Sequence, residues 1–275
     1  MIDAKKTDSL QPSIGVRSMH YLIKNILPVI VVFFAIFIVW AILFRLNLWP
    51  QYLFPSPLQV LDKLVALWNQ GLLARGVGIT IQRLMVAFSL SLMLGIALAF
   101  LMANFPTLGR GTQPYILGLQ TLPSIAWVPL GILWFGYSES ALLFVTIVGS
   151  VFSITISFTD AIKTVPPTYI RAARNMGCDG IELLYRVSIP ASLPNLISGT
   201  KQGWSFAWRS LLGAEIIFAT AGLGFLLNVG REFLDISQVV AMMVTVLFLG
   251  ILFERIIFNK IQEWVNRRWG LSPHT

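Results

Sequence analysis

The sequence predicts an all-α integral membrane protein with about six transmembrane helices. Hydrophobic residues make up 56% of its 275 residues and charged residues only 12%, about half the charged fraction of a soluble domain. Several nearly uncharged runs reach about twenty residues, which is the length that crosses a hydrocarbon layer of about 30 Å. The basic residues lie mostly beside these runs, as is typical of loops that flank membrane spans.

Six apolar runs are the candidate spans. The first is too long for the apolar core of a signal peptide, so we expect it to be a retained span. The third contains Pro123 and Pro129, and proline at membrane depth indicates a helix that is broken where protein or water satisfies the freed carbonyls. The six runs are 26–46, 80–103, 113–135, 141–161, 193–218 and 238–258.

Two segments between the spans also show structure. In 47–79, Pro57 suits the start of a short amphipathic helix that Gly71 ends. Residues 220–237 begin with glycines and continue as an apolar helical run. This second segment either dips back into the membrane or lies along its surface, and both alternatives stay open.

The distribution of basic residues predicts the orientation. With six spans both termini share one side, which holds thirteen of the twenty Lys and Arg residues, against four on the other side. The positive-inside rule then places the termini in the cytoplasm of a multi-pass protein of the bacterial inner membrane. We divide the chain into a cytoplasmic N-terminal segment (1–25), a transmembrane domain (26–258, with a hairpin at 163–190) and a cytoplasmic tail (259–275).

Composition argues against several other functions. The net charge of +8 is spread beside the spans and forms no basic block of the kind that binds nucleic acid. Cys178 is the only cysteine, so no intrachain disulfide can form, and His20 and His274 lie near the chain ends, so no metal site is expected. The sequence also lacks a nucleophile elbow or paired inward carboxylates, so we do not expect an enzyme.

The polar segment "YIRAARNMGCDGIELLYRVSIPASLPN" (169–195) predicts a cytoplasmic hairpin of two short helices. Pro166 and Pro167 suit a helix start, and Gly177 suits a left-handed end. Asp179 followed by Glu182 has the spacing of a capping box. We expect the second helix to run to about Ser188 and to stop before Pro190.

Such a hairpin suits docking to another protein. Small residues would let a partner approach closely, and aliphatic residues would anchor it, whereas a plain solvated connector does not need two capped helices. The small residues are Ala172, Ala173 and Gly177, and the aliphatic ones are Ile170, Ile181 and Leu184.

This segment resembles the coupling motif of bacterial ABC importer permeases, E-A-A-x3-G-x9-I-x-L-P. Arg171-Ala172-Ala173 is followed by Gly177 at the matching distance, and 187–190 (VSIP) falls where the family has I-x-L-P. Arginine replaces the first glutamate. Three further stretches resemble the nitrate/sulfonate/taurine branch of that family: "FPSP" (54–57), "LPSIAWVPLGILWFG" (122–136) and "GWSFAWRSLLGAE" (203–215).

The resemblance implies a type I ABC importer permease fold. Two permease copies would form the pathway, two ATPase subunits would bind the hairpins, and a periplasmic or lipid-anchored binding protein would deliver the solute. The chain itself has no G-x-x-x-x-G-K-[ST] sequence, and Gly222-x-Gly224 lacks the context of a dinucleotide loop. ATP and Mg would thus be used by the partner, with no cofactor bound here. The residues implied in ATPase coupling are Arg171, Ala172, Ala173, Gly177, Asp179, Glu182 and Pro190.

The fifth span carries charges that predict a substrate pathway. An ionisable residue at membrane depth is costly unless it faces protein, a partner charge or water. A cationic cavity edged by aromatic rings would suit an oxyanion, to which Arg209 offers paired donors. Gln120, Thr121 and Ser124 near the broken third span would add neutral hydrogen-bonding groups. The pathway candidates in span five are Lys201, Trp204, Trp208, Arg209 and Glu215.

Each of these candidates also has a structural alternative. Lys201 can snorkel to the interface, Glu215 can pair with an arginine of another span, and the tryptophans can be packing residues. Glu254 and Arg255 are expected to be interfacial or paired. Gly199 and Gly203 have the GxxxG spacing of a close helix contact, which could lie at a dimer axis.

The leading hypothesis is therefore the permease subunit of an ATP-driven importer for a small oxyanion, namely an aliphatic sulfonate, taurine or nitrate. One alternative is the same type of importer permease with a neutral or cationic heterocycle, such as a vitamin precursor, as its solute. The other alternative is a stand-alone secondary carrier, but the sequence shows no repeated halves of the kind that many such carriers have.

Overall fold

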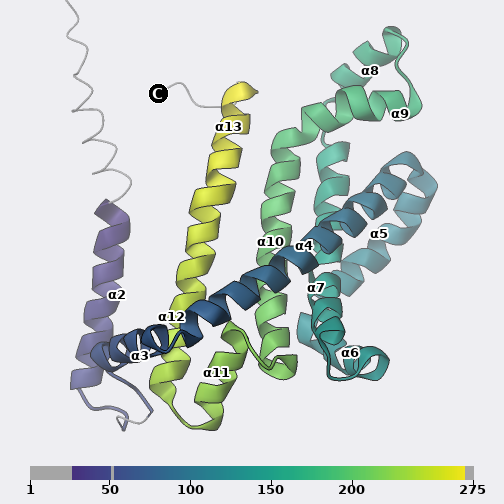
Figure 1. Ribbon diagram of the computed structural model, residues 1–275. Coiled ribbons are helices and arrows are strands. Elements are labelled where there is room, and N and C mark those ends of the chain that lie inside the picture. Colours follow the sequence, from purple (N-terminus) through teal and green to yellow (C-terminus); the bar gives the residue numbers. More distant parts are fainter. Residues whose placement is uncertain (1–26, 51–52, 270–275) are drawn as a thin grey trace, which may run out of the picture. The chain divides into compact units, whose positions relative to one another are not determined.

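The computed structural model describes residues 27–50 and 53–269, and every regular element in that part of the chain is a helix (Figure 1). The expected cytoplasmic segment 1–25 and the last residues of the tail lie outside the described ranges. Contacts divide the chain into two units, Met1–Leu61 and Asp62–Thr275.

The first unit contains α2 (Leu27–Arg45) and the start of α3 (Pro57–Asn69). Trp40 of α2 donates from its indole N–H to the carbonyl of Pro55 (3.1 Å). The helix α3 begins where Pro57 predicted it, and Ser56 and Gln59 cap it reciprocally through 3.2 Å and 2.8 Å bonds. Gly71 follows α3 with φ +72°, the left-handed conformation expected of the residue that ends this helix.

Three long helices form the centre of the second unit: α4 (Leu72–Asn104), α7 (Glu139–Lys163) and α10 (Ile189–Phe218). The helices α7 and α10 run side by side, and α4 crosses them (Figure 1). Fully buried Ile154 of α7 lies between two glycines. A Cβ atom on Gly95 of α4 would come within 2.6 Å of it, and one on Gly203 of α10 within 2.4 Å.

This packing explains the Gly199–Gly203 spacing. A Cβ on Gly199 would meet Ser157 of α7 at 2.9 Å, so both glycines let α10 approach α7 of the same chain. The expected close helix contact is confirmed, and it lies within the chain instead of at a dimer axis.

The third predicted span is sharply bent. The helix α5 (Pro106–Thr121) meets a 3₁₀ turn (Ser124–Trp127) and α6 (Val128–Phe135) at 99°. Pro123 causes the break, because it disfavours the helical conformation of Leu122, which is extended (φ −68°, ψ 129°). Pro129, which we expected to interrupt the span as well, lies in the first turn of α6, where its missing N–H costs nothing.

The remaining elements complete the predicted series. The helix α11 (Leu223–Glu232) fills the segment 220–237 and is bent by 48° from the helix before it. The last span, α12 (Ile236–Phe253), continues through a π-helical turn (Glu254–Asn259) into α13 (Lys260–Arg268), so the helix extends ten residues beyond its predicted end at 258.

The six predicted runs thus coincide with helices, but not with six uninterrupted spans. Within the described residues, three helices are long and apolar enough to cross a membrane: Leu72–Asn104, Glu139–Lys163 and Ile236–Arg268. The number rises to five if each of the two bent pairs is one span. The first predicted span corresponds to the apolar helix α2.

Candidate functional site

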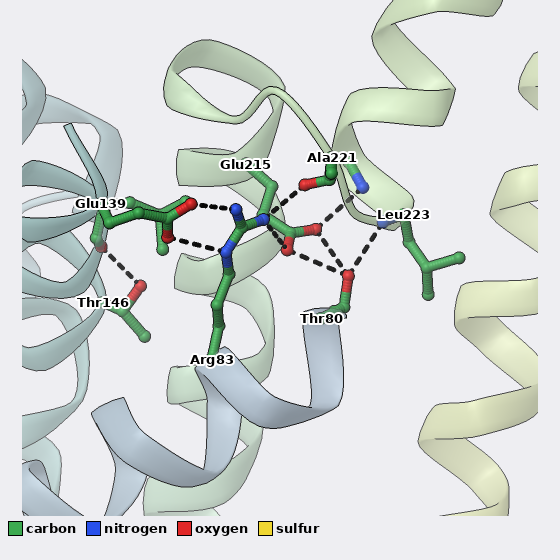
Figure 2. Close-up of polar contacts among 9 residues, drawn as sticks. Thr80, Arg83, Glu139, Thr146, Glu215, Ala221 and Leu223 are labelled. Carbon is green, nitrogen blue, oxygen red and sulfur yellow. Dashed lines mark hydrogen bonds and ion pairs between the residues drawn. The ribbon is translucent and has the colours of Figure 1, made fainter. Parts of the chain in front are cut away.

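A cluster of polar side chains around the buried pair Arg83–Glu215 joins four helices of the second unit (Figure 2). Arg83 of α4 is at its centre and is only 8% exposed. Its guanidinium donates to both carboxylate oxygens of Glu139, the first residue of α7, with 2.8 Å between Nε and Oε2. It also donates to Glu215 Oε1 of α10 (2.9 Å) and to the carbonyl of Ala221.

The Thr80 hydroxyl and the Gly224 amide complete the coordination of Glu215, whose side chain is fully buried. The Thr80 hydroxyl, one turn before Arg83, donates to Glu215 Oε2 (2.8 Å) and accepts from the Leu223 N–H (2.8 Å). The Gly224 N–H donates to Glu215 Oε2 (3.0 Å). We call Thr80, Arg83, Glu139 and Glu215 the Arg83 cluster.

The glycine pair before α11 makes room for this carboxylate. A Cβ on Gly222 would lie 2.5 Å from Glu215 Oε1, and Gly222 has φ +121°, a conformation that side chains rarely adopt. A Cβ on Gly224 would lie 2.5 Å from the Glu215 Cβ. The Gly222-x-Gly224 sequence therefore receives a glutamate of the same chain.

Glu215 is accordingly bound within the protein, so the alternative in which it pairs with an arginine of another span is confirmed. Its oxygens are engaged by Arg83, Thr80 and Gly224 and do not face a cavity. In the sequence, Arg83 lies inside the second predicted span (80–103), and no local pattern indicates its partner. The signal that could have found it is that an arginine at membrane depth needs a carboxylate at a similar depth.

Four of the five span-five candidates do share a cavity. It has a volume of about 470 Å³, lies among α10, α11 and α12, and is lined by Lys201, Trp204, Trp208 and Arg209 together with apolar residues of α12. Lys201 already forms an ion pair within the chain, because its Nζ lies 2.7 Å from Glu254 Oε1 in the π-helical turn. This ion pair confirms that Glu254 is paired.

The two tryptophans are largely buried packing residues. Trp204 contacts the rings of Phe88, Phe253 and Phe258 at centroid distances of 5.1 to 5.7 Å. Trp208 lies 6.4 Å from Phe253. Each is less than 10% exposed, so the alternative reading as packing residues is confirmed, although one edge of each lines the cavity.

Arg209 differs from the other cations of these spans. Its guanidinium carbon lies 4.6 Å above the Phe206 ring, its Nε donates to the Ser205 carbonyl (3.2 Å), and the residue is exposed. Among the described residues no carboxylate forms an ion pair with it. Its remaining N–H groups are therefore available to a ligand.

A second hollow, of about 310 Å³, adjoins Arg209 at the break of the third span. It is lined by Gln120, Thr121, Ser124 and Ser210 as well as Arg209. Gln120 Oε1 is enclosed and has no hydrogen-bond partner in the described structure. The three neutral residues that we predicted for a pathway therefore lie beside the available arginine.

The predicted hairpin is present, with α8 (Pro167–Asn175) and α9 (Gly180–Leu183). Gly177 between them has φ +87°, the expected left-handed conformation. Exposed Arg171 and Ala172 lie on α8, and four large residues of the hairpin region are exposed as well: Tyr169, Met176, Ile181 and Tyr185.

Three predictions about the hairpin were wrong. Asp179 does occupy the predicted N-cap position of α9, but no capping box forms: its side chain pairs with Arg174 (3.4 Å), and Glu182 pairs with Arg186 (3.2 Å). Ala173 and Leu184 are buried within the hairpin instead of facing a partner.

Nor does the second helix stop before Pro190. A π-helical turn (Leu184–Ser188) carries it into α10, and the Ile189 N–H bonds to Leu184 O, five residues earlier. Pro190 has no N–H to donate to the carbonyl four residues earlier, and the wider π-helical turn before it tolerates this missing hydrogen bond. The Pro190 carbonyl accepts a bond from the Trp269 indole (3.0 Å).

Residues 91–270 match the family model described as "binding-protein-dependent transport system inner membrane component", so the chain belongs to this family. It is 28% identical over 234 residues to the taurine transport system permease protein TauC of Escherichia coli, which covers 82% of this chain and 85% of TauC. It is 31% identical over 193 residues to the formylaminopyrimidine transport permease protein ThiX of Halalkalibacterium halodurans, covering 70% and 76% of the two chains.

A solved structure supports the fold. The chain of an inward-facing MetNI methionine ABC transporter superposes with a TM-score of 0.62 at 20% identity, covering 72% of this chain and 97% of that one. The protein is thus a permease subunit of an ABC importer with the type I fold, and it is an inner-membrane component. Such a permease works with an ATPase and a substrate-binding protein.

Proposed function

We propose that this permease imports a small organic oxyanion, an aliphatic sulfonate such as taurine or an anion such as nitrate, and that Arg209 contacts the anionic group. The observation that supports this most directly is the difference among the in-span cations. Arg83 and Lys201 each pair with glutamate, whereas Arg209 keeps unused donors next to two hollows. A planar guanidinium with free N–H groups suits the oxygens of a sulfonate or nitrate.

The similarity to TauC favours a sulfonate, whereas the similarity to ThiX keeps a heterocycle as the second candidate. The two candidate solutes require different properties of the side chain at position 209. A sulfonate needs the positive charge, while a neutral heterocycle would bind through hydrogen bonds and stacking and would tolerate its loss.

The proposal extends to the assembly. Two copies of the chain would enclose the pathway and two ATPase subunits would bind the exposed face of the hairpin, with ATP and Mg used by those subunits. The chain would carry out transport and no chemical reaction, and both termini would be cytoplasmic. The hairpin residues proposed for coupling are those named from the sequence, with Ala173 acting through the hairpin's own packing.

The test is uptake by the complete importer, reconstituted with its ATPase and binding protein in liposomes. Arg209→Glu should reduce the initial rate of labelled taurine uptake at least tenfold, whereas Arg209→Lys should retain part of it because the charge remains. Arg231→Glu, which reverses an exposed arginine of α11, is the matched control and should leave uptake unchanged. Taurine uptake that survives Arg209→Glu would overturn the oxyanion assignment, and uptake of a neutral pyrimidine by the same variant would favour the second candidate.

A further inference from the structure

A third hollow lies where two apolar spans end. It has a volume of about 500 Å³ and is formed by the end of α4, the start of α5, the last turn of α7 and the inner face of the hairpin. Three cations line it, namely Arg110, Lys163 and Arg174, and no aspartate or glutamate is among its lining residues. We call it the basic hollow.

The three cations retain donors for a ligand. Lys163 Nζ gives one bond to Gln113 Oε1 (3.0 Å), and Arg110 Nε gives a long one (3.4 Å) to the Pro106 carbonyl. Arg174 has a carboxylate partner, Asp179, but both side chains are more than 60% exposed. An exposed pair of this kind contributes little and exchanges readily for another anion.

The position of the basic hollow matches the level of lipid headgroups. Met102 and Ala103 lie in the last turn of the apolar helix α4, and Ile162 in the last turn of α7. Both helices are long enough to cross the hydrocarbon layer, so their ends mark the depth at which lipid phosphates lie.

These three cations differ from other basic residues beside the spans, because they line one common hollow. Lys260 and Arg267 are exposed on α13 and line no hollow that we describe. Arg110, Lys163 and Arg174 instead come from three different helices and line one hollow, whose other walls include Ile170 and Leu184. Cations above apolar walls suit an anionic group that is attached to an acyl chain.

We propose that the basic hollow binds the phosphate of an anionic phospholipid, and that this phosphate connects the hairpin to α5 and α7. Basic pockets between helices at the membrane surface bind such headgroups. The site uses the inner face of the hairpin and leaves its exposed residues Tyr169, Met176 and Ile181 for a partner. The lipid would therefore set the position of the coupling element without competing for its outer surface.

The experiment measures lipid binding by the full-length chain. Purified protein in nanodiscs of phosphatidylcholine with a minor fraction of phosphatidylglycerol is released into the gas phase, and native mass spectrometry counts the retained lipids. Wild type should enrich phosphatidylglycerol. Arg110→Gln/Lys163→Gln should lower this enrichment on the order of tenfold, while Lys260→Gln/Arg267→Gln, which removes the same charge outside the basic hollow, should retain it.

Inorganic phosphate distinguishes a lipid headgroup from a free anion. In nanodiscs of phosphatidylcholine alone, millimolar phosphate should not raise the melting temperature of wild type, whereas phosphatidylglycerol should. A phosphate effect without phosphatidylglycerol enrichment would overturn the lipid assignment. Equal loss of enrichment in the two double variants would overturn the site, and the melting temperatures of both variants show whether either has simply unfolded.

Discussion

The Arg83 cluster and the hairpin α8–α9, proposed above to couple to the ATPase, both contain arginine–carboxylate pairs, but these pairs differ in burial. Arg83 and Glu215 are at most 9% exposed at their side chains, whereas Glu182 and Arg186 of the hairpin are 48% and 68% exposed. Water cannot replace a lost partner at the buried Arg83–Glu215 pair, so each of these two groups depends on the other. In the second region water and salt compete with the pair, which leaves those charges free for binding.

The two regions also differ in how they connect the helices. The Arg83 cluster ties α4, α7, α10 and the start of α11 together through side-chain and backbone bonds. The hairpin instead joins the spans through the tip of α7 and the continuous helix that leads into α10. The cluster therefore joins the helices at one end, and the hairpin lies at the other end of α7 and α10 (Figure 1).

The largest effect is expected from Glu215→Leu. This change leaves the Arg83 guanidinium buried with one fewer carboxylate, and breaking a buried pair costs roughly 3–5 kcal/mol. The free energy of unfolding should fall by about that amount in a denaturant titration in detergent micelles. Glu182→Leu in the hairpin is the control, and its effect should stay below about 1 kcal/mol. Similar losses for the two variants would refute the comparison.

A smaller effect is expected from Thr80→Val. The isosteric change removes the donor to Glu215 and the acceptor of the Leu223 N–H, and unsatisfied buried groups cost about 1–3 kcal/mol. The matched control is Thr155→Val, because Thr155 is equally buried but bonds only to a carbonyl of its own helix. The prediction fails if the control loses as much unfolding free energy as Thr80→Val.

The smallest effect concerns the partly exposed pair between Lys63 and Asp235, outside the spans. Burial raises the pKa of Asp235, but hydrogen bonds from Lys63 and the Gln238 N–H outweigh it and hold the pKa below its ordinary value of 3.8. The pair therefore stabilises the fold above about pH 4 and loses this contribution as the pH falls further. Because each side chain is about a third exposed, the contribution is at most about 1 kcal/mol.

Asp235→Asn tests this pair, because asparagine can still cap α12 through the Gln238 N–H. The variant should melt slightly below wild type at pH 7, and the difference should shrink as the pH falls below the ordinary aspartate pKa of 3.8. A difference that does not change with pH would show that something other than the charge of Asp235 is responsible.

Much of the fold followed from the sequence, because membrane insertion depends on local composition. Uninterrupted apolar runs had to become helices, since a spanning segment must satisfy its own backbone. Pro57, Pro167 and Gly177 marked helix ends correctly because their backbone constraints act without distant partners. Pro123 broke its helix for the same reason.

Tertiary structure alone decided how the polar side chains are used. The partners Arg83 and Glu215 are 132 residues apart in the chain, so no local pattern could pair them. The spacing of Asp179 and Glu182 predicted a capping box, but each carboxylate forms an ion pair with a nearby arginine instead. Arg209 remained available because folding brought Glu254 to Lys201 and Glu215 to Arg83. Hydropathy determines where a segment lies, whereas the choice of partner for a charge depends on which helices pack together.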